Sequence, residues 1–216
     1  MFVSDWMTAK VYTVTPDDSI SRAVSIMKER NIRHLPVVSG ESVVGIVSDR
    51  DIKEFSPSKA TTLDVYELHY LLEKTTVREV MKKKPITTTD DTPIEEAALI
   101  MHGAGIGCLP VLDSKERLVG IITYKDIYKV LVDITGAQSR GARISLLLTD
   151  KPGSIKEAAD IIRSFDLQLR SILSSHEGTP EGFRRVVIRT RKKESLDTEA
   201  LRKQLSVLDP HVKVKA

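Results

Sequence analysis

The strongest constraint on the fold is an internal repeat in the first 135 or so residues. Two seven-residue phrases, GIVSDRD at residues 45–51 and GIITYKD at residues 120–126, are its most similar parts. Upstream of them, an offset of 74 residues aligns Met7 with Met81 and Leu35-Pro36-Val37 with Leu109-Pro110-Val111. One extra residue in a turn then shifts the offset to 75. Because self-similarity of this kind marks a structural unit used twice, we expect two units of the same fold.

Each copy predicts the order strand, helix, strand, strand, helix. Its first helix has an apolar stripe at the spacing of one helical face. The stripes are Ile20, Ala23, Val24 and Met27 in the first copy and Ile94, Ala97, Ala98 and Met101 in the second. In the second copy, Thr92 as N-cap and Pro93 as the first helical residue are the start signals. The aliphatic runs GCLPVLD and RLVGIIT predict a buried hairpin, after which Asp51 and Asp126 begin the closing helices.

A different pattern follows the second copy. The small and polar residues 136–141 predict a hinge. In ARISLLLTD the alternation of Ile144, Leu146 and Leu148 predicts a strand, and Pro152-Gly153-Ser154 opens a helix. Two more strands, a helix from about Asp197 and a last strand complete the order βαββαβ. Residues 142–216 therefore predict a ferredoxin-like unit, and the whole chain belongs to the α+β class.

Composition and charge exclude several functions. The 216 residues include 33 basic and 30 acidic side chains, and a net charge of +3 is too small for a dedicated nucleic-acid or membrane-surface protein. Basic runs such as Lys82-Lys83-Lys84 fit solvated strand or loop ends. Without a helix-turn-helix pattern, a DNA-binding regulator is a poor hypothesis.

The sequence also gives no sign of catalysis or of a resident metal. It lacks a recognisable pair of nucleophile and base, a Walker-type phosphate loop and an acidic cluster, so we do not expect an enzyme or a cofactor. The histidines show no metal-ligand spacing. A single cysteine, no apolar run of membrane-spanning length and no signal-peptide pattern at the start predict a cytoplasmic protein.

The paired phrases resemble a tandem pair of CBS domains, the Bateman module. Each has the form G-h-h-[ST]-x-x-D, where h is apolar, and each follows an apolar-Pro-Val strand. The resemblance covers residues 2–135 and implies one repeat at 1–62 and a second at 63–135, which includes a linker helix capped near Asp64. It also implies two pseudo-symmetric clefts between the repeats, which in this family commonly hold adenosine nucleotides.

The shared ends of the two phrases, a hydroxyl residue followed three residues later by aspartate, are suited to a nucleotide. A carboxylate can accept hydrogen bonds from both hydroxyls of a ribose, and a hydroxyl at a helix N-terminus can contact a phosphate. By resemblance, Asp51 and Asp126 would bind ribose, and Ser48 and Thr123 would bind phosphate. A hydroxyl followed three residues later by an acid is also a plain helix-capping arrangement. The two interpretations can coexist.

The two copies differ where a phosphate would be held. Just before Pro36 the first copy has Arg33 and His34, which resemblance assigns to phosphate contacts. The alternative is that both side chains are simply exposed at a strand start. The second copy has Gly107 and Cys108 at these positions, and Cys108 is best interpreted as a small buried apolar residue. By resemblance, Thr13 and Thr87 would contact the adenine.

The C-terminal unit resembles an ACT domain over residues 142–216. The resemblance rests on the βαββαβ order together with the D-x-P-G segment Asp150-Lys151-Pro152-Gly153. ACT domains often bind amino acids where this glycine lets a ligand approach a helix N-terminus. Gly153, Ser154 and Ile155 are then the ligand candidates. The alternative is that Gly153 only permits a tight strand-to-helix turn.

The combination of a CBS pair and an ACT domain resembles the AcuB-type acetoin-utilisation proteins. The predicted function is a non-enzymatic regulatory sensor that binds an adenosine nucleotide at the CBS pair and an amino acid or other metabolite at the ACT domain, in a homodimer. The alternative is a ligand-free structural or interaction module that regulates or holds an unidentified partner enzyme. Neither hypothesis involves nucleic acid or a membrane.

Overall fold

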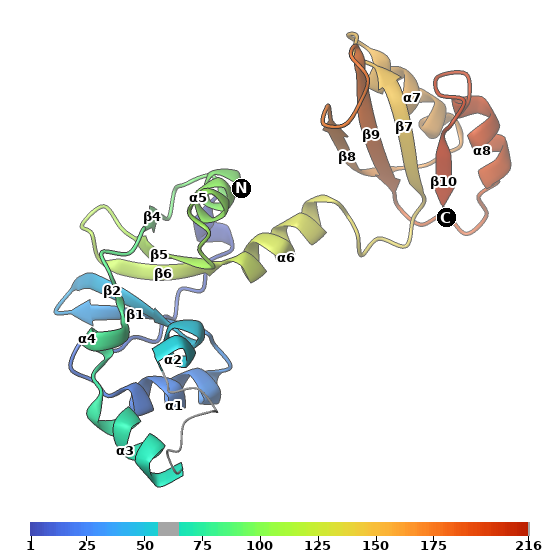
Figure 1. The fold of residues 1–216 in the computed structure, drawn as a ribbon. Coiled ribbons are helices and arrows are strands. Elements are labelled where there is room, and N and C mark those ends of the chain that lie inside the picture. The colour runs from blue at the N-terminus through green and yellow to red at the C-terminus, as the bar shows by residue number, and fades with distance from the viewer. Residues whose placement is uncertain (56–64, 216) are drawn as a thin grey trace. The chain divides into compact units, whose positions relative to one another are not determined.

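A computed structural model describes residues 1–55 and 65–215 of the chain (Figure 1). These residues form two compact units, one from Met1 to Tyr128 and one from Lys129 onward. The predicted boundary between the repeats at residues 62–63 and the predicted cap at Asp64 lie outside the described residues. Within the described ranges, no helix combines the length and the apolar character needed to cross a bilayer.

The first copy of the repeat folds around a small aliphatic core. Its elements are η1 (Val3–Asp5), α1 (Ile20–Arg30), β1 (His34–Ser39), β2 (Ser42–Ser48) and α2 (Asp49–Phe55). Helix α1 begins at a cap in which Ser19 accepts a hydrogen bond from the Arg22 N–H. Its apolar stripe faces the core, where Ile20 and Ala23 are fully buried. The first strand predicted for this copy is reduced to a single bridge between Val14 and Val37.

The second copy repeats this arrangement after a linker helix. Its elements are α3 (Val65–Lys74), α4 (Val77–Val80), β3 (Lys82–Lys83), β4 (Thr88–Thr89), α5 (Ile94–Ala104), β5 (Cys108–Leu112), β6 (Leu118–Thr123) and α6 (Tyr124–Ile134). The predicted cap of α5 was wrong: Pro93 occupies the N-cap position. Thr92 is unavailable as the cap because its hydroxyl oxygen accepts hydrogen bonds from Thr88 and Thr89 instead. The predicted starts of the closing helices were also wrong: α2 and α6 begin two residues before Asp51 and Asp126, respectively.

The two copies exchange their leading segments. The sheets have the orders β1-β2-β3 and β4-β5-β6, so β3 of the second copy pairs with β2 of the first. In return, Thr8 of the first copy forms a bridge with Ile121 in β6 of the second. The exchange brings Met81 against Gly45 and Met7 against Gly120, so closely that a Cβ atom at either glycine would overlap a methionine sulfur. This close contact explains why each repeated phrase begins with glycine, the residue that has no Cβ atom.

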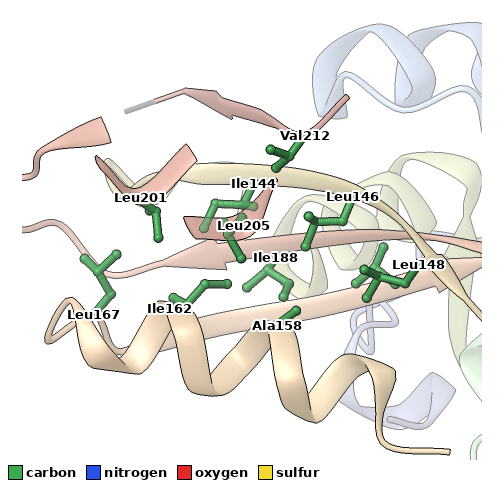
Figure 2. Close-up of a cluster of buried hydrophobic side chains, with 11 residues drawn as sticks. Ile144, Leu146, Leu148, Ala158, Ile162, Leu167, Ile188, Leu201, Leu205 and Val212 are labelled. Atoms are coloured by element: carbon green, nitrogen blue, oxygen red, sulfur yellow. The ribbon is translucent and has the colours of Figure 1, made fainter. Parts of the chain in front are cut away.

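The second unit has the predicted order of elements. They are β7 (Arg143–Thr149), α7 (Ser154–Ser164), β8 (Leu169–Ser175), β9 (Phe183–Thr190), α8 (Thr198–Leu205) and β10 (Lys213–Lys215). The antiparallel sheet has the order β10-β7-β9-β8, which is the ferredoxin-like topology. Figure 2 shows Ile162 of α7 and Leu205 of α8 directed at Ile144 and Ile188 of the sheet, and all four side chains are fully buried.

Candidate functional site

Each repeated phrase ends in a hydrogen-bonded cap. Asp51 accepts a hydrogen bond from the Ser48 N–H at 2.9 Å and another from the Ser48 hydroxyl, and its own N–H donates to the Ser48 hydroxyl oxygen at 3.2 Å. In the second copy, Asp126 accepts from the Thr123 N–H at 3.0 Å and from the Thr123 hydroxyl at 2.7 Å. The capping interpretation is therefore correct for both copies, whatever else these side chains bind.

In the first copy the cap is linked to a cation from the other copy. Lys82 Nζ lies 3.1 Å from Asp51 Oδ1, the carboxylate oxygen that the cap leaves free of Ser48. Burial of Asp51 acts to raise the pKa of its carboxyl, but hydrogen bonds from Ser48 and Lys82 outweigh burial and the pKa is lowered. Asp51 is therefore a buried carboxylate that carries its charge at neutral pH.

A cleft of about 810 Å³ opens beside this carboxylate, between the two copies. We call it the interrepeat cleft. Its lining residues are Arg33, His34, Ile46, Ser48, Asp49, Arg50, Asp51, Glu54, Lys82, Lys83, Lys84, Pro85, Ile86, Gly105, Ile106, Gly107, Cys108 and Tyr124. The volume is within the range of small-molecule sites, roughly 300–1,000 Å³. One wall is basic, and Ile46, Ile86 and Ile106 supply apolar surface.

His34 and Gly107, one from each copy, lie in close contact in the lining of this cleft. A Cβ atom at Gly107 would lie 3.2 Å from His34 Nε2 and 3.5 Å from a ring carbon of Tyr124. Burial lowers the pKa of His34, partly offset by the negative charges of Asp49 and Asp51, so the ring is neutral at pH 7. Burial raises the pKa of the Cys108 thiol to about 12, which makes it an unreactive lining group.

The structure brings four of the eight predicted nucleotide contacts to one place. Arg33, His34, Ser48 and Asp51 all line the interrepeat cleft. The other four, Thr13, Thr87, Thr123 and Asp126, are not among its lining residues. Thr13 and Thr87 are half-buried, and Asp126 is buried within its cap.

Sequence reasoning missed the basic wall of this cleft. Lys82, Lys83 and Lys84, interpreted as a solvated strand end, line the cleft together with Arg33. The sequence carried one signal for this position. The repeat aligns Lys82 with Thr8, so the lysines follow Met81 as Thr8 follows Met7. Without knowledge that the leading segments cross between the copies, however, this segment would be placed beside its own repeat rather than beside Asp51.

The ACT-like candidates lie where the sequence places them, at the start of α7. Gly153 has φ +91°, a backbone conformation that favours glycine, and a Cβ atom there would meet nothing within 4 Å. Ser154 is buried, and Ile155 packs against the core of the second unit. The nearby Asp150 accepts hydrogen bonds from Arg184 Nε at 2.7 Å and is 2.9 Å from His176 Nε2.

Comparison with known proteins places the repeat in a family. The family described as "CBS domain" matches residues 3–58 and 77–133. A CBS domain-containing protein from Dictyostelium discoideum is 30% identical over 135 residues, which are 62% of this chain and 93% of that protein. Homoserine O-acetyltransferase from Methanohalobium evestigatum is 34% identical over 60% of this chain, but the match spans only 24% of the enzyme.

Solved structures match the same part of the chain. A protein described as an acetoin utilization protein, AcuB, from Vibrio cholerae has a TM-score of 0.53 and 30% identity over 64% of this chain and 95% of its own. CBSX2 from Arabidopsis thaliana, solved in complex with AMP, has a TM-score of 0.53 and 25% identity over 62% of this chain and 97% of its own.

A CBS domain pair solved with 5′-methylthioadenosine and S-adenosyl-L-methionine has a TM-score of 0.50 and 30% identity. It covers 61% of this chain and 99% of that one. The repeated phrases, the two similar sheets and the family match over most of the first unit agree with one another. The chain therefore belongs to the CBS-domain family and carries two copies of that domain.

Proposed function

We propose that the protein is a non-catalytic regulatory sensor whose interrepeat cleft binds an adenosine nucleotide. One observation carries the proposal: the buried, charged Asp51 and a wall of cations share a cleft large enough for a nucleotide. The AMP complex of CBSX2 and the S-adenosyl-L-methionine complex of another CBS pair support an adenosine ligand. In two homologous enzymes, a homoserine O-acetyltransferase and an inosine-5′-monophosphate dehydrogenase, the region that matches this protein is only 24% and 28% of the enzyme's length.

The chemistry of the cleft fits each part of such a ligand. Asp51 accepts the ribose hydroxyls, and Ser48 at the start of α2 donates to a phosphate oxygen. Lys82 has a largely exposed side chain and can turn from Asp51 to a phosphate. Arg33, His34 and the neighbouring lysines complete a site that favours a phosphorylated ligand over adenosine itself.

The second copy would form a weaker or less charged site. There Asp126 and Thr123 take the ribose and phosphate roles, and Thr13 and Thr87 contact the adenine of either ligand. The support is the repeated cap, which has the same geometry in both copies. Gly107 and Cys108 replace the cation and histidine of the first copy, so phosphate binding is weaker.

We extend the proposal to the second unit as an ACT domain in a cytoplasmic homodimer of the AcuB type. The ferredoxin-like topology and the positive φ of Gly153 support it. An amino acid would place its carboxylate near the N–H groups of Gly153, Ser154 and Ile155 at the start of α7. Asp150, in the same D-x-P-G segment, accepts a hydrogen bond from Arg184, which offsets its negative charge.

The alternative is a ligand-free module that regulates or holds a partner enzyme. One observation favours it: both oxygens of Asp51 already have partners, because Oδ2 is capped by Ser48 and Oδ1 is paired with Lys82. A nucleotide must therefore displace Lys82 before the ribose can bind. Nucleotide released from the purified protein on denaturation would distinguish the sensor from the scaffold.

Calorimetric titration of AMP, ATP and adenosine tests the sensor. Arg33→Ala should weaken AMP and ATP by about tenfold, the value of one charge-assisted hydrogen bond, and leave adenosine unchanged. Lys28→Ala, on the exposed side of α1, is the matched control and should change no affinity. If Arg33→Ala leaves all three affinities unchanged, the phosphate assignment is wrong. If no ligand binds to the parent protein, the scaffold is favoured.

A further inference from the structure

A second cleft lies wholly within the C-terminal unit and includes none of the ligand-binding residues proposed above. It has a volume of about 310 Å³. We call it the basic cleft, and its lining residues are Val132, Asp133, Gly136, Gln138, Ser139, Arg140, Arg170, Arg191 and Lys192. Four of these side chains are cations and one is a carboxylate, so the cleft has a strong local excess of positive charge.

The four cations are available to a ligand. Among the residues that the structure describes, no carboxylate lies within 4.0 Å of Arg140, Arg170, Arg191 or Lys192. Several other cations of the same unit do have such partners: Arg184 pairs with Asp150, Lys156 with Asp160 and Lys193 with Asp166. A cluster of like charges without counter-charges repels itself, and an anion in the cleft would relieve that repulsion.

Hydrogen bonds and one close packing contact fix the chain segment that forms one side of the basic cleft. The Ser171 hydroxyl donates to the Thr135 carbonyl at 2.9 Å, and the Ser139 hydroxyl donates to the Thr190 carbonyl at 3.1 Å. Thr190 is fully buried and also accepts from the Ala142 N–H at 3.0 Å. Gly141 lies so close to Thr190 that a Cβ atom would overlap its carbonyl group. The segment predicted as a hinge thus holds its cleft residues against the sheet.

Arg170 is directed by an irregularity of β8. The pairing of β8 with β9 shifts between Leu169 and Ser171, which leaves Arg170 as the extra residue of a bulge. A bulge changes the direction of the side chain at the extra residue, and bulges are frequent beside binding sites. The side chain passes Gly136, where a Cβ atom would lie 3.1 Å from Arg170 Cγ, so a small residue at this position leaves room for it.

We propose that the basic cleft binds a small phosphorylated molecule. Three guanidinium groups provide planar pairs of N–H donors that match phosphate oxygens, and Gln138 can add an amide donor. Four cations against one carboxylate suit a ligand of charge −2 or more better than a single carboxylate. The volume, at the lower end of the small-molecule range, fits a phosphate monoester or pyrophosphate rather than a nucleotide.

The test is an amide NMR titration of the full-length protein with pyrophosphate, with glycerol 3-phosphate and with acetate. We expect saturable shifts of the Gly136, Ser139 and Arg170 amides with pyrophosphate and with glycerol 3-phosphate, and weaker effects with acetate. The lower of the two dissociation constants shows whether the site prefers an inorganic anhydride or a phosphate ester. The shifts should decrease as salt is added. Shifts confined to the interrepeat cleft, or equal responses to acetate, would overturn the proposal.

The Arg170→Gln/Arg191→Gln double variant locates the site. Both side chains are exposed, so the fold should be unaffected, and the dissociation constant should increase at least about tenfold. The control is Lys203→Gln/Lys213→Gln, which removes the same charge from exposed positions of the same unit and should bind like the parent. Equal weakening in both double variants would show only nonspecific charge attraction and would contradict the proposed site.

Discussion

The caps of the two repeats are nearly identical, whereas the residues that face them differ. Ser48 with Asp51 and Thr123 with Asp126 form the same hydrogen bonds at the start of the closing helix. Opposite Asp51, however, the other copy contributes Lys82, which forms an ion pair. The matching position opposite β6 carries Thr8. The repeated phrase therefore fixes the local structure, whereas the segment supplied by the other copy places a cation beside Asp51 and a threonine beside β6.

The largest expected difference between the copies concerns nucleotide affinity. Asp51→Ala should raise the dissociation constant for AMP on the order of 100-fold, because a charged acceptor for two ribose hydroxyls is lost. Asp126→Ala should abolish only the weaker of the two AMP-binding events and leave the dissociation constant of the tighter event unchanged. Calorimetric titration of both variants measures the difference.

Stability provides the internal control for these two variants. Both lose an equivalent cap, which should lower the free energy of unfolding by about 1 kcal/mol in each. Asp51→Ala also loses the ion pair with Lys82, which should add at most about 1 kcal/mol. Trp6, the single tryptophan of the chain, lies in the first unit and reports its unfolding by fluorescence. Equal loss of affinity in the two variants would mean that the copies are equivalent sites.

The next comparison concerns the two glycines of the repeated phrases. Gly45→Ala and Gly120→Ala should each lower the free energy of unfolding by about 1–3 kcal/mol, because the new Cβ atom meets a methionine of the other copy. For Gly120, the three nearest atoms all belong to Met7, so Met7→Ala should relieve the overlap. At Gly45, the new Cβ atom would also lie 3.1 Å from the Lys82 carbonyl oxygen, so Met81→Ala should relieve the overlap only in part.

Double-mutant cycles, followed by Trp6 fluorescence in urea, measure this relief as a coupling free energy. The Met7 and Gly120 pair should have the larger coupling. If neither pair shows coupling, the methionines do not limit the side chain at the glycines, and another constraint must explain the repeated glycine.

The smallest expected effect is a difference in pH dependence between His34 and the aligned Cys108. Burial lowers the pKa of His34 in the folded state, so the unfolded state binds more protons as the pH falls through about 6.5. Stability should therefore decrease from pH 7.5 to about 5.5, by less than about 1.4 kcal/mol per pH unit for this one group.

Replacing His34 isolates its share of this loss. His34→Asn should show a smaller decrease over the same interval in urea denaturation followed by Trp6. Cys108→Ala should follow the parent protein, because a thiol with a pKa of about 12 does not titrate there. A pH dependence unchanged by His34→Asn would assign the effect to other groups.

Local patterns predicted most of the fold. The apolar stripes of α1 and α5, the two hairpins and the order βαββαβ are local in the sequence, because the periodicity of burial follows directly from helix and strand geometry. The start of α5 was predicted wrongly because the Thr92 hydroxyl oxygen accepts hydrogen bonds from Thr88 and Thr89, three and four residues earlier, and this local turn competes with the helix cap. Helix boundaries depend on such competition and are correspondingly harder to predict.

The site was predictable only where its residues share a local motif. Ser48 and Asp51 are three residues apart, and their cap could be inferred from spacing alone. Lys82 and Gly107 come from the other copy, and no local pattern indicates which side of the cleft they reach. The placement of Lys82 depends on the pairing of β3 with β2, a long-range contact that a single sequence does not encode in any short window.

That pairing affects how the repeat can be inherited. A chain cut between the two copies would yield an N-terminal fragment without the outer strand of its sheet and a C-terminal fragment without the segment that adjoins β6. Neither fragment could complete its own sheet, although a mixture of the two could reassemble. Gene duplication could therefore create this architecture, but later loss of either half would expose an unpaired strand edge, so selection acts on the pair as one heritable unit.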